Sequence, residues 1–414
     1  MLTSISIFYN DIKQLKINAV QFNIRHLFCA LEIRKHANLS EAARHVHLTQ
    51  SALTQSIRKL EKSIGVPLFK RATTGMFVTP EGEVFLRRFE RGFAYIEYFA
   101  NTLFNADRTA RLVFLRGIGA RQLAALIQVV EHQSYTAASR VMGLTQPTLH
   151  RTIKELETLC GQSLFTRSPT GVEATWRARQ LSRLAGLYFA ELQQGLDELQ
   201  ELAGSGHGSL KLGSLPLTRT SIIPNAVLKL TELAPQAHIS IVDGPYEEQL
   251  HALLHGQIDI LIGALRFPPL SDEITQHHLF NDNLSLVFRH GHPLATQPTL
   301  SSVDWSSLKW IVPKTGTPAR AIFEELFATM ELPVPGDIIE CSSLVATRGM
   351  LINSDRAALL PARQVEVDVQ AGLLAVSPLR LGDPARQIGY TLRKGWTPTR
   401  LQASFLTILE QCTQ

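Results

Sequence analysis

The hydrophobic and polar positions of the first half of the chain form a pattern that occurs twice. In residues 48–61, LTQSALTQSIRKLE, the apolar residues Leu53, Ile57 and Leu60 recur at helical spacing. Residues 144–157, LTQPTLHRTIKELE, repeat the pattern, and the match continues in register without a gap beyond both ends of the stretch. A match of this length predicts a duplicated domain. Two copies are too few for a stacked solenoid.

Each copy predicts three helices in a row. In the first copy an apolar-periodic helix covers IRHLFCALEIRKH, a short helix covers LSEAARHVH with Ser40 as its N-cap, and a third helix follows its N-cap Thr49. Gly65 suits the left-handed position that ends the third helix. Ala42 and Ala138 are small residues at the expected close contact between the second and third helices. The corresponding caps of the second copy are Thr136, Thr145 and Gly161.

A short helix joined by a tight turn to a longer one predicts a helix-turn-helix, whose second helix enters the major groove of DNA. Hydroxyl, amide and cationic side chains on its outward face match phosphates and base edges. Any surface helix shows polar residues outward, but the duplication of the pattern with its caps favours DNA recognition. The candidate DNA-binding residues on this helix are Gln50, Ser51, Thr54, Gln55 and Arg58 in the first copy and Gln146, Thr148, His150, Arg151 and Lys154 in the second.

A short hairpin, or wing, is expected after the third helix of each copy. In the first copy Leu68 and Phe69 supply an apolar anchor, and a Thr-Gly turn follows at Thr74, which recurs as Thr170 in the second copy. An arginine between the anchor and the turn would lie beside the phosphate backbone. The candidate arginines are Arg71 and Arg167.

The stretch LSEAARHVHLTQSALTQSIRKLEKSIGVPLFKR, followed by VTPEG, resembles the winged helix-turn-helix of the LysR-type transcriptional regulators. The second copy resembles the same module but departs at its end, where ATWRA replaces VTPEG. The resemblance implies a long linker helix after the wing, which pairs with its counterpart in a dimer. Residues 83–104 and 179–204 are suitably amphipathic. The family normally carries one module, whereas this sequence contains two. A dimer of this chain would therefore present four modules.

The balance of charge is consistent with DNA as a partner of the first half. Residues 1–204 hold 25 Lys and Arg against 17 Asp and Glu, whereas residues 205–414 hold 16 against 19. A polyanion requires this excess of positive charge, although a solvated surface explains it as well. The four cysteines are isolated, and the sequence contains neither a secretory signal nor an apolar run of about 20 residues. We therefore expect a cytoplasmic protein, and the resemblance to the LysR type implies a bacterial one.

From Ser209 onwards short apolar runs alternate with amphipathic helices. LKLGSL, HISIVDG and DILIGAL predict strands, a second round begins near Leu284, and RAALLP at 356–361 is expected to return the chain to the first subdomain. The alternation predicts a mostly parallel sheet. The phrases LLHGQIDILIGAL, RHGHPLA and LLPARQV resemble the effector-binding domain of the LysR type. That resemblance implies a pair of α/β lobes like those of periplasmic binding proteins.

The resemblance also implies that a small effector binds between the lobes, at strand ends and helix N-termini. Hydroxyls and helix N-termini favour an anion, so the expected effector is an organic or aromatic carboxylate, with no other cofactor. Each hydroxyl is equally well explained as an ordinary helix cap, and Arg219 and Arg266 as salt-bridged surface residues. The candidate effector-binding residues are Ser214, Leu215, Pro216, Thr218, Gly263, Ala264, Arg266, Thr315, Thr317, Ser342 and Ser343.

Sequence motifs for enzyme or metal function are weak. His251 and His255 are spaced like zinc ligands, but the order H-E-x-x-H and a third ligand are missing. The sequence contains no P-loop, G-x-S-x-G or dinucleotide fingerprint. The competing interpretation is a cytoplasmic small-molecule-binding or enzymatic α/β domain with accessory helical repeats. We expect instead a non-enzymatic regulator without catalytic or metal-binding residues. Its expected partners are double-stranded DNA, an effector, further copies in a dimer or tetramer and the transcription machinery, but no membrane.

The predicted fold class is a multidomain α+β protein, with two tandem winged helix-turn-helix domains and their linker helices before a two-lobed effector domain. The predicted boundaries are 1–22 for an N-terminal extension, 23–82 and 111–178 for the two modules, 83–110 and 179–207 for the linker helices, and 208–414 for the effector domain. Its lobe I is expected at about 208–266 and 357–414, and its lobe II at about 267–356.

Overall fold

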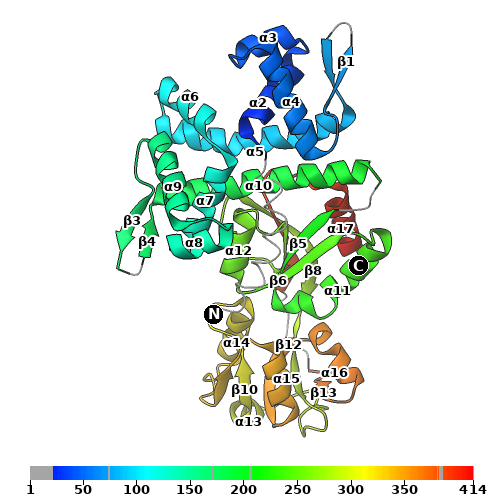
Figure 1. The fold of residues 1–414 in the computed structure, drawn as a ribbon. Helices are drawn as coiled ribbons and strands as arrows, with labels where there is room; N and C mark the ends of the chain where they lie inside the picture. Colours follow the sequence, from blue (N-terminus) through cyan, green and yellow to red (C-terminus); the bar gives the residue numbers. More distant parts are fainter. Residues whose placement is uncertain are drawn as a thin grey trace.

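The computed structural model describes residues 22–72, 75–169, 171–204, 208–379, 381 and 386–413. The predicted N-terminal extension up to residue 21, the turn residues Thr74 and Thr170, and residues 205–207 of the predicted linker lie outside this described part. The described chain forms two helical modules, two long helices and two α/β lobes (Figure 1).

The two modules, called module 1 and module 2, are built from the same elements in the same order. Each has three helices and then a two-stranded antiparallel hairpin. Thr49 and Thr145 cap the third helices, and Gly65 and Gly161 end them at positive φ, as the sequence predicts. Module 1 comprises α2 (Ile24–His36), α3 (Leu39–His45), α4 (Gln50–Ile64), β1 (Phe69–Ala72) and β2 (Gly75–Val78). Module 2 comprises α7 (Ala120–His132), α8 (Tyr135–Met142), α9 (Gln146–Cys160), β3 (Phe165–Ser168) and β4 (Gly171–Ala174).

The predicted caps of the second helices are wrong. Ser40 and Thr136 lie inside α3 and α8, whose N-caps are Asn38 and Ser134, two residues earlier. The Asn38 side chain accepts hydrogen bonds from the backbone N–H groups of Ser40 (2.9 Å) and Glu41 (3.2 Å). An extended residue with a short polar side chain satisfies the free N–H groups of the first turn, so the helix begins directly after it.

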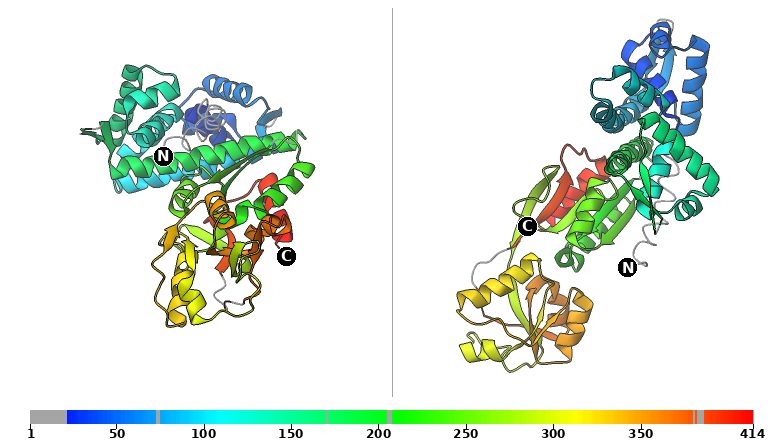
Figure 2. Two further views of the ribbon diagram at one scale, coloured as in Figure 1. Left: turned by 90° about the horizontal axis from the view of Figure 1, so that it is seen from below. Right: turned by 90° about the vertical axis from the view of Figure 1, so that its left-hand side faces the viewer.

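Two long helices follow the hairpins and pack against each other, side by side in all views (Figures 1 and 2). They run antiparallel, because Phe85 of the first approaches Gly195 of the second, whereas Gly92 approaches Tyr188. The buried side chains of both modules and both long helices form one continuous hydrophobic core. The long helices are α5 (Pro80–Phe104) and α10 (Trp176–Leu202), and α6 (Arg108–Gly117) connects α5 to module 2.

Lobe I is built on a five-stranded sheet of order β6-β5-β7-β14-β8. β5 pairs in parallel with β6 and β7, whereas β14 is antiparallel to β7 and β8. Separate hydrophobic clusters involve α11 and α17 in one case and α12 in the other. The elements of lobe I are β5 (Ser209–Ser214), η1 (Pro216–Arg219), α11 (Ile222–Leu233), β6 (His238–Asp243), α12 (Tyr246–Leu254), β7 (Ile260–Ala264), β8 (Ile274–Asp282), β14 (Arg386–Arg393) and α17 (Arg400–Gln411).

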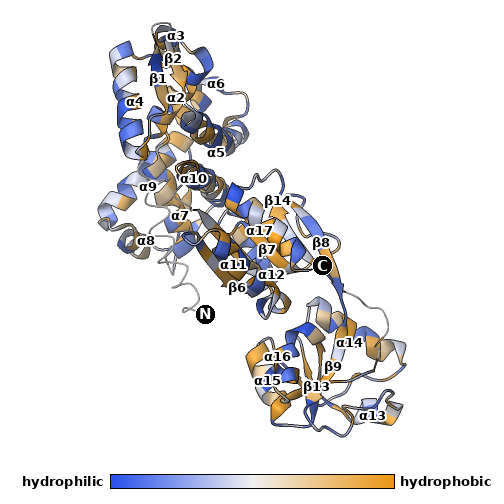
Figure 3. Cartoon of the chain, turned by 90° about the vertical axis from the view of Figure 1, so that its right-hand side faces the viewer, coloured by the Kyte–Doolittle hydropathy of each residue, from blue (hydrophilic) through white to orange (hydrophobic). Residues whose placement is uncertain are grey.

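Lobe II is built on a second five-stranded sheet, of order β11-β10-β12-β9-β13. Hydrophobic residues gather in the strands of both lobes, whereas the surface helix α4 of module 1 is largely hydrophilic (Figure 3). The elements of lobe II are β9 (Leu284–Arg289), α13 (Ser302–Ser307), β10 (Lys309–Val312), α14 (Pro318–Thr329), β11 (Ile338–Glu340), α15 (Leu344–Ile352), β12 (Arg356–Pro361), η2 (Ala362–Gln364), α16 (Glu366–Gln370) and β13 (Leu374–Val376).

Three expectations for the lobes are corrected. The sheets are mixed rather than mostly parallel, because β14 is antiparallel to β7 and β8 in lobe I, and β9 is antiparallel to β12 and β13 in lobe II. The run RAALLP forms β12, which pairs with β10 and β9 in lobe II, so the chain returns to lobe I only after β13. β8 lies in the sheet of lobe I, although the predicted boundary assigns it to lobe II. An apolar run reports burial on both faces, but not the sheet in which a strand is buried.

Among the described residues no single helix has both the length and the apolar composition of a bilayer-crossing segment. One pair, Arg108–Gly117 with Ala120–His132, meets the criterion when the two helices are counted together, but the pair is bent by 91°.

Candidate DNA-binding and effector-binding sites

The predicted DNA-binding residues lie on the solvent side of α4 and α9. Leu53, Ile57 and Leu60 of α4 are buried, as are their equivalents in α9, which fixes the opposite face of each helix outward. All ten predicted residues of these helices are exposed except Thr54, which is half-buried. Arg71 on β1 and Arg167 on β3 are exposed beside these faces on the hairpins.

The helices predicted to enter the major groove, α4 and α9, are called the recognition helices below. The first glutamine of each is tied to the helix before it. Gln50 Nε2 donates to Ser40 Oγ at 2.7 Å, and Thr136 Oγ1 donates to Gln146 Oε1 at 3.2 Å. These bonds join equivalent positions in the two modules. They give Ser40 and Thr136 a role in positioning α4 and α9 rather than in capping. The signal available in the sequence was a hydroxyl ten residues before a glutamine in both copies.

A glutamate in each module, which the sequence analysis does not single out, anchors the hairpin to the recognition helix. Glu61 Oε1 accepts from the backbone N–H groups of Leu68 (2.8 Å) and Phe69 (3.1 Å). Glu157 Oε1 accepts from the equivalent N–H groups of module 2 at 2.8 and 3.3 Å. Because the bond spans the junction between helix and hairpin, it sets where the wing lies beside the recognition helix.

The outward faces of the two recognition helices differ in their ion pairs. Arg151 Nε contacts Glu155 Oε1 at 3.0 Å, and both side chains are largely exposed. Lys154 Nζ contacts Glu157 Oε2 at 2.6 Å, so this lysine also belongs to the hairpin anchor. At the equivalent positions of α4 stand Gln55 and Arg58, for which the described residues supply no such pair.

The two long helices meet at equivalent positions of the repeat. Gly92 and Tyr188 are separated by the repeat interval, and a Cβ atom on Gly92 would lie 3.1 Å from Tyr188 O. Contact between equivalent residues is the mark of two-fold, isologous packing, which is usually found between two copies of a chain. Here both halves of the approximate two-fold belong to a single chain.

A buried ion network breaks this approximate symmetry. Arg88 Nη1 donates to Glu191 Oε2 (3.1 Å) and Gln194 Oε1 (2.8 Å) of α10, and Nη2 donates to Glu198 Oε1 (2.5 Å). Burial alone would lower the pKa of the Arg88 guanidinium, but Glu198 and Glu191 outweigh burial and raise it. Arg88 Nη1 also donates to Thr397 O (2.9 Å), in the segment between β14 and α17. The network therefore joins the long helices to lobe I.

Lobe I gathers polar atoms without partners at the carboxyl ends of three adjacent strands. Ser214 Oγ at the end of β5, Tyr246 Oη and Gln249 Oε1 on α12 after β6, and Arg266 Nη1 after β7 are buried and form no hydrogen bond among the described residues. Ser214 is 1% exposed and Gln249 3%. The Arg266 guanidinium lies 4.7 Å from the centre of the Tyr246 ring, and burial lowers its pKa. Ser214 and Arg266 are among the residues that the sequence predicts for this site, whereas Tyr246 and Gln249 are not.

Several other predicted effector residues already have structural roles. Thr218 Oγ1 donates to Leu215 O (3.0 Å) and Ile262 O (3.2 Å), and the Thr218 side chain is fully buried. Gly263 has a φ of 157°, and a Cβ there would lie 2.4 Å from Leu215 Cβ, so it permits close packing of the loop. Pro216 O accepts a hydrogen bond from Gln364 Nε2 of lobe II at 3.3 Å, which joins the two lobes beside the predicted site.

The predicted hydroxyls of lobe II act mainly as caps. Thr317 Oγ1 accepts from Arg320 N at the start of α14, and Ser343 Oγ accepts from Ala346 N at the start of α15. Thr315 Oγ1 donates to Glu340 Oε2 at 3.0 Å. The remaining predicted positions, Ala264 and Ser342, are half-buried and exposed, respectively.

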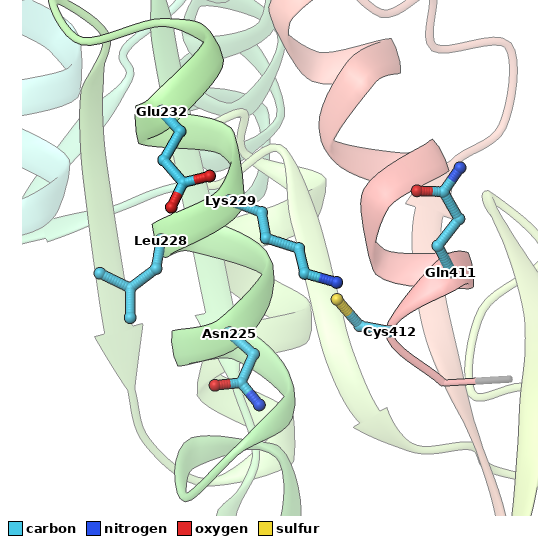
Figure 4. Close-up of a pocket in the computed structure, with 6 residues that line it drawn as sticks. All are labelled: Asn225, Leu228, Lys229, Glu232, Gln411 and Cys412. Atoms are coloured by element: carbon cyan, nitrogen blue, oxygen red, sulfur yellow. The ribbon is translucent and has the colours of Figure 1, made fainter.

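A surface groove of lobe I lies away from the predicted site. It is formed between α11 and the end of α17, and no predicted effector residue lines it (Figure 4). The lining residues of the groove are Asn225, Leu228, Lys229, Glu232, Gln411 and Cys412.

Arg219, which the sequence analysis also considers, contacts Asp243 Oδ2 through Nη1 at 3.3 Å and is therefore salt-bridged.

Comparison with known protein families gives matches along most of the chain. A family described as "Bacterial regulatory helix-turn-helix protein, lysR family" matches twice, at residues 24–83 and 120–179. A family described as "LysR substrate binding domain" matches residues 203–413. The two matches of the first family coincide with module 1 and module 2 and include the first residues of each long helix.

The chain is similar to one relative along nearly its whole length and to a shorter relative along about two thirds of it. The HTH-type transcriptional regulator GalR of Pseudomonas putida is 30% identical over 390 residues, which cover 94% of this chain and 97% of that relative. The HTH-type transcriptional regulator PcaQ of Agrobacterium fabrum is 27% identical over 280 residues, 67% of this chain and 90% of that relative. PcaQ is therefore the shorter protein. Both are named as transcriptional regulators, as expected for a regulator rather than an enzyme.

The fold is similar to that of a solved regulator. The crystal structure of CbnR, a LysR family transcriptional regulator, superimposes with a TM-score of 0.51 at 19% identity, covering 71% of this chain and 99% of that chain. A structure of full-length CbnR complexed with target DNA gives the same TM-score and covers 70% of this chain.

Proposed function

We propose that this protein, which belongs to the LysR family of bacterial transcriptional regulators, reads one operator with two winged helix-turn-helix modules on a single chain. We propose further that it responds to a small anion bound by its C-terminal half. The observation that carries the two-module proposal is the meeting of α5 and α10 at the equivalent positions Gly92 and Tyr188.

Both modules retain the parts that a DNA-reading unit needs. Each keeps a threonine cap, a glutamine tied to the preceding helix, a glutamate that anchors the hairpin, and an exposed arginine on the hairpin. Exposed residues of a copy that no longer bound DNA would be free to change, whereas its buried leucines would still be needed for folding. The exposed hairpin arginine neither closes a helix nor anchors the hairpin, and its survival in both copies, as Arg71 and Arg167, supports two working modules.

The pairing of α5 with α10 changes how copies of the chain assemble. In the family a linker helix pairs with its counterpart in a dimer, whereas here the counterpart is the second long helix of the same chain. One chain then presents two recognition helices, and a dimer presents four. Further assembly, to a dimer or a tetramer, requires other surfaces.

The test of the two-module proposal is the number of half-sites bound by one chain. Duplexes selected by the full-length protein from a random pool are footprinted, and the mass of each complex is measured. We expect two half-sites for each chain and an affinity that falls steeply with salt, because phosphate contacts release counterions. One half-site for each chain would contradict the proposal.

The effector proposal rests on the unpartnered polar atoms of lobe I. A buried polar atom without a partner costs about 1–3 kcal/mol, and a bound ligand removes that cost. A carboxylate accepts hydrogen bonds from Arg266 and Ser214, and a donor group on the same ligand satisfies Gln249 Oε1. Organic and aromatic carboxylates with a hydroxyl or amino group are therefore the ligands that we propose.

A thermal-shift screen of such carboxylates tests this site on the full-length protein. Arg266→Met and Ser214→Ala should weaken binding of a hit about tenfold or more, since hydrogen bonds to charged groups are worth about 1.5–3 kcal/mol. Arg289→Met is the matched control, because it removes an arginine from a surface ion pair with Asp355 in lobe II. Thr317→Val reports whether lobe II contributes. Unchanged binding in both lobe I variants would contradict the proposed site.

A further inference from the structure

Four side chains that can bind or support a metal ion gather between α2 and α3 of module 1. His36 Nε2 lies 3.4 Å from Glu32 Oε2, and His36 Nδ1 lies 3.4 Å from Glu41 Oε1. The rings of His36 and His45 stack with centroids 4.3 Å apart. One ligand atom each from Glu32, His36 and His45 lies within 4.8 Å of the other two. We propose that these three residues bind one divalent transition-metal ion of the Zn²⁺ type.

The spacing of the first two ligands matches that of a tetrahedral ion. Two ligand atoms, each about 2.0–2.1 Å from Zn²⁺ and separated by the tetrahedral angle, lie about 3.4 Å apart. His36 Nε2 and Glu32 Oε2 already have this separation. His36 Nε2 is buried and forms no hydrogen bond among the described residues. This nitrogen is therefore available to bind a metal ion that lies between it and Glu32.

Glu41 supplies the support that a metal-bound histidine normally has. A ligating imidazole usually donates its other N–H to a carboxylate, which fixes the tautomer and raises the basicity of the ligating nitrogen. Glu41 Oε1 lies beside His36 Nδ1, opposite to the atom that faces Glu32. Nδ1 then carries the proton and Nε2 carries the free lone pair. Stacking of the His36 and His45 rings does not by itself require a carboxylate at one nitrogen of His36 and a free lone pair at the other.

His45 completes the set from the neighbouring helix. Its side chain is exposed, so a turn about its side-chain bonds brings a ring nitrogen toward the ion without disturbing the core. Three protein ligands leave one position for water, as in open zinc sites. Two imidazoles and a carboxylate favour Zn²⁺, Co²⁺, Ni²⁺ or Cu²⁺ over Mg²⁺ and Ca²⁺. His36 is also the last residue of α2, where the helix dipole favours a cation.

Module 2 keeps the fold but lacks the cluster. The equivalents of Glu32, Glu41 and His45 are Gln128, Ala137 and Val141, and only His36 has a histidine equivalent, His132. Module 2 nevertheless forms the same three helices and hairpin, so the scaffold does not need these side chains to fold. The cluster is therefore an addition to module 1 rather than part of its core.

An ion at this site would act on the recognition helix through short connections. It would link α2 to α3, and Ser40 of α3 holds Gln50 of α4 at 2.7 Å. Ala37, which follows His36, accepts a hydrogen bond from Met76 N of the hairpin at 3.4 Å. Binding would therefore stiffen module 1 and leave module 2 unchanged, so that metal supply would act on one half of the DNA-reading pair.

The experiment uses the full-length chain after removal of metal with a chelator. Co²⁺ is titrated as a spectroscopic probe of tetrahedral sites, and Zn²⁺ is titrated by calorimetry. We expect one ion for each chain. The variant Glu32→Gln/His45→Val, which installs the residues of module 2, should lose at least a hundredfold in affinity. Glu41→Ala should lose about tenfold to a hundredfold, as outer-shell partners typically do.

Two controls assign the ion to this site. His251→Gln removes one member of the other close histidine pair, whose rings stack at 3.7 Å, and it should leave the Co²⁺ spectrum and the stoichiometry unchanged. Thermal unfolding without metal checks that the variants fold. The proposal is overturned if the full-length chain binds no ion, or if Glu41→Ala and the double variant bind as tightly as the parent chain.

Discussion

Module 1 and module 2 share a scaffold but differ in many of the charged groups that the scaffold presents. Both place a glutamate behind the hairpin, a threonine before the recognition helix and a glutamine against the preceding helix. They differ in the metal ligands proposed for module 1, in the ion pairs of the recognition helices and in their contacts with the C-terminal half. Glu131 of module 2 accepts a hydrogen bond from Gln257 of lobe I at 3.2 Å, and its equivalent in module 1 is Lys35.

This comparison separates what folding requires from what assembly and regulation require. Residues that close a helix, anchor the hairpin or fill the core recur in both copies, because a change there costs stability in either module. Residues that face lobe I occur once, because module 2 lies beside lobe I, whereas the long helices lie between module 1 and lobe I (Figure 1). The long helices show the same division. They meet at equivalent positions, yet Arg88 of α5 has Leu184 as its equivalent in α10.

The largest loss of stability should come from removing the charge of Arg88, which only one of the two long helices carries. Arg88→Leu installs the residue of the other long helix and leaves Glu198 and Glu191 buried with less compensation. Breaking a buried ion pair on one side typically costs about 3–5 kcal/mol, so we expect a large fall in the unfolding midpoint of the full-length chain. Denaturant unfolding followed by circular dichroism measures it.

Arg87→Leu is the matched control, because Arg87 is the exposed neighbour of Arg88 on the same helix. It should change stability by no more than about 0.5 kcal/mol. Equal stability of the two variants would mean that the Arg88 network contributes little. The junction between α5 and α10 would then be held by its apolar contacts alone.

The sequence predicted the repeated scaffold well because its signals are local. Thr49, Gly65 and the apolar spacing of α4 each act within a few residues, and the duplication shows every signal twice. The caps of the second helices were wrong because Asn38 and Ser40 both offer a short polar side chain, and only the backbone decides between them. The pairing of α5 with α10 was not predicted within one chain, because an amphipathic helix does not specify its partner.

The candidate effector site was predicted less completely. Ser214 and Arg266 follow strands, and their position at the strand ends was readable from the sequence. Tyr246 and Gln249 belong to the same group only because β6 lies beside β5 in the sheet. The network around Arg88 brings together residues about a hundred and three hundred positions apart. No local pattern encodes a contact of that kind.

The next largest effect should appear in DNA recognition. If both modules read bases, Gln55→Ala and Arg151→Ala should each relax specificity at a different operator position, by about 1–3 kcal/mol. The surface pair of Arg151 with Glu155 does not prevent this, because an exposed ion pair is worth at most about 1 kcal/mol. Binding to a set of single-base operator variants measures the loss. A variant that leaves every position unchanged would identify its module as a scaffold.

A smaller loss of stability, equal in the two modules, is expected when the caps of the recognition helices are removed. Thr49→Ala and Thr145→Ala each remove a side-chain acceptor for a backbone N–H of the first turn. Loss of such a cap typically costs about 1 kcal/mol. Hydrogen exchange of the amides of α4 and α9 measures the local cost in each module. A clear difference between the two modules would show that one of them depends on contacts beyond its own helices.

The smallest effect concerns the turn before each recognition helix. The equivalent residues His47 and Gly143 both have positive φ, 56° and 63°, and their N–H groups donate to the equivalent carbonyls of Arg44 and Arg140. Left-handed backbone costs an L-residue roughly 1–2 kcal/mol, whereas glycine adopts it readily but loses about 0.5–1 kcal/mol of chain entropy on folding. His47→Gly should therefore stabilise module 1 by about 0.5–1 kcal/mol, and Gly143→Ala should destabilise module 2 by about 1 kcal/mol.

A Cβ atom at Gly143 would meet no heavy atom within 4 Å, so backbone strain alone sets the second value. Amide hydrogen exchange in α3 and α8 reports each module separately, and the unmutated module of each variant serves as the internal reference. Stabilisation by His47→Gly together with destabilisation by Gly143→Ala would show that the two turns have the same backbone and differ only in the residue that occupies it. If His47→Gly instead weakens module 1, the histidine side chain stabilises the turn by more than its backbone strain costs, and the two turns are not equivalent.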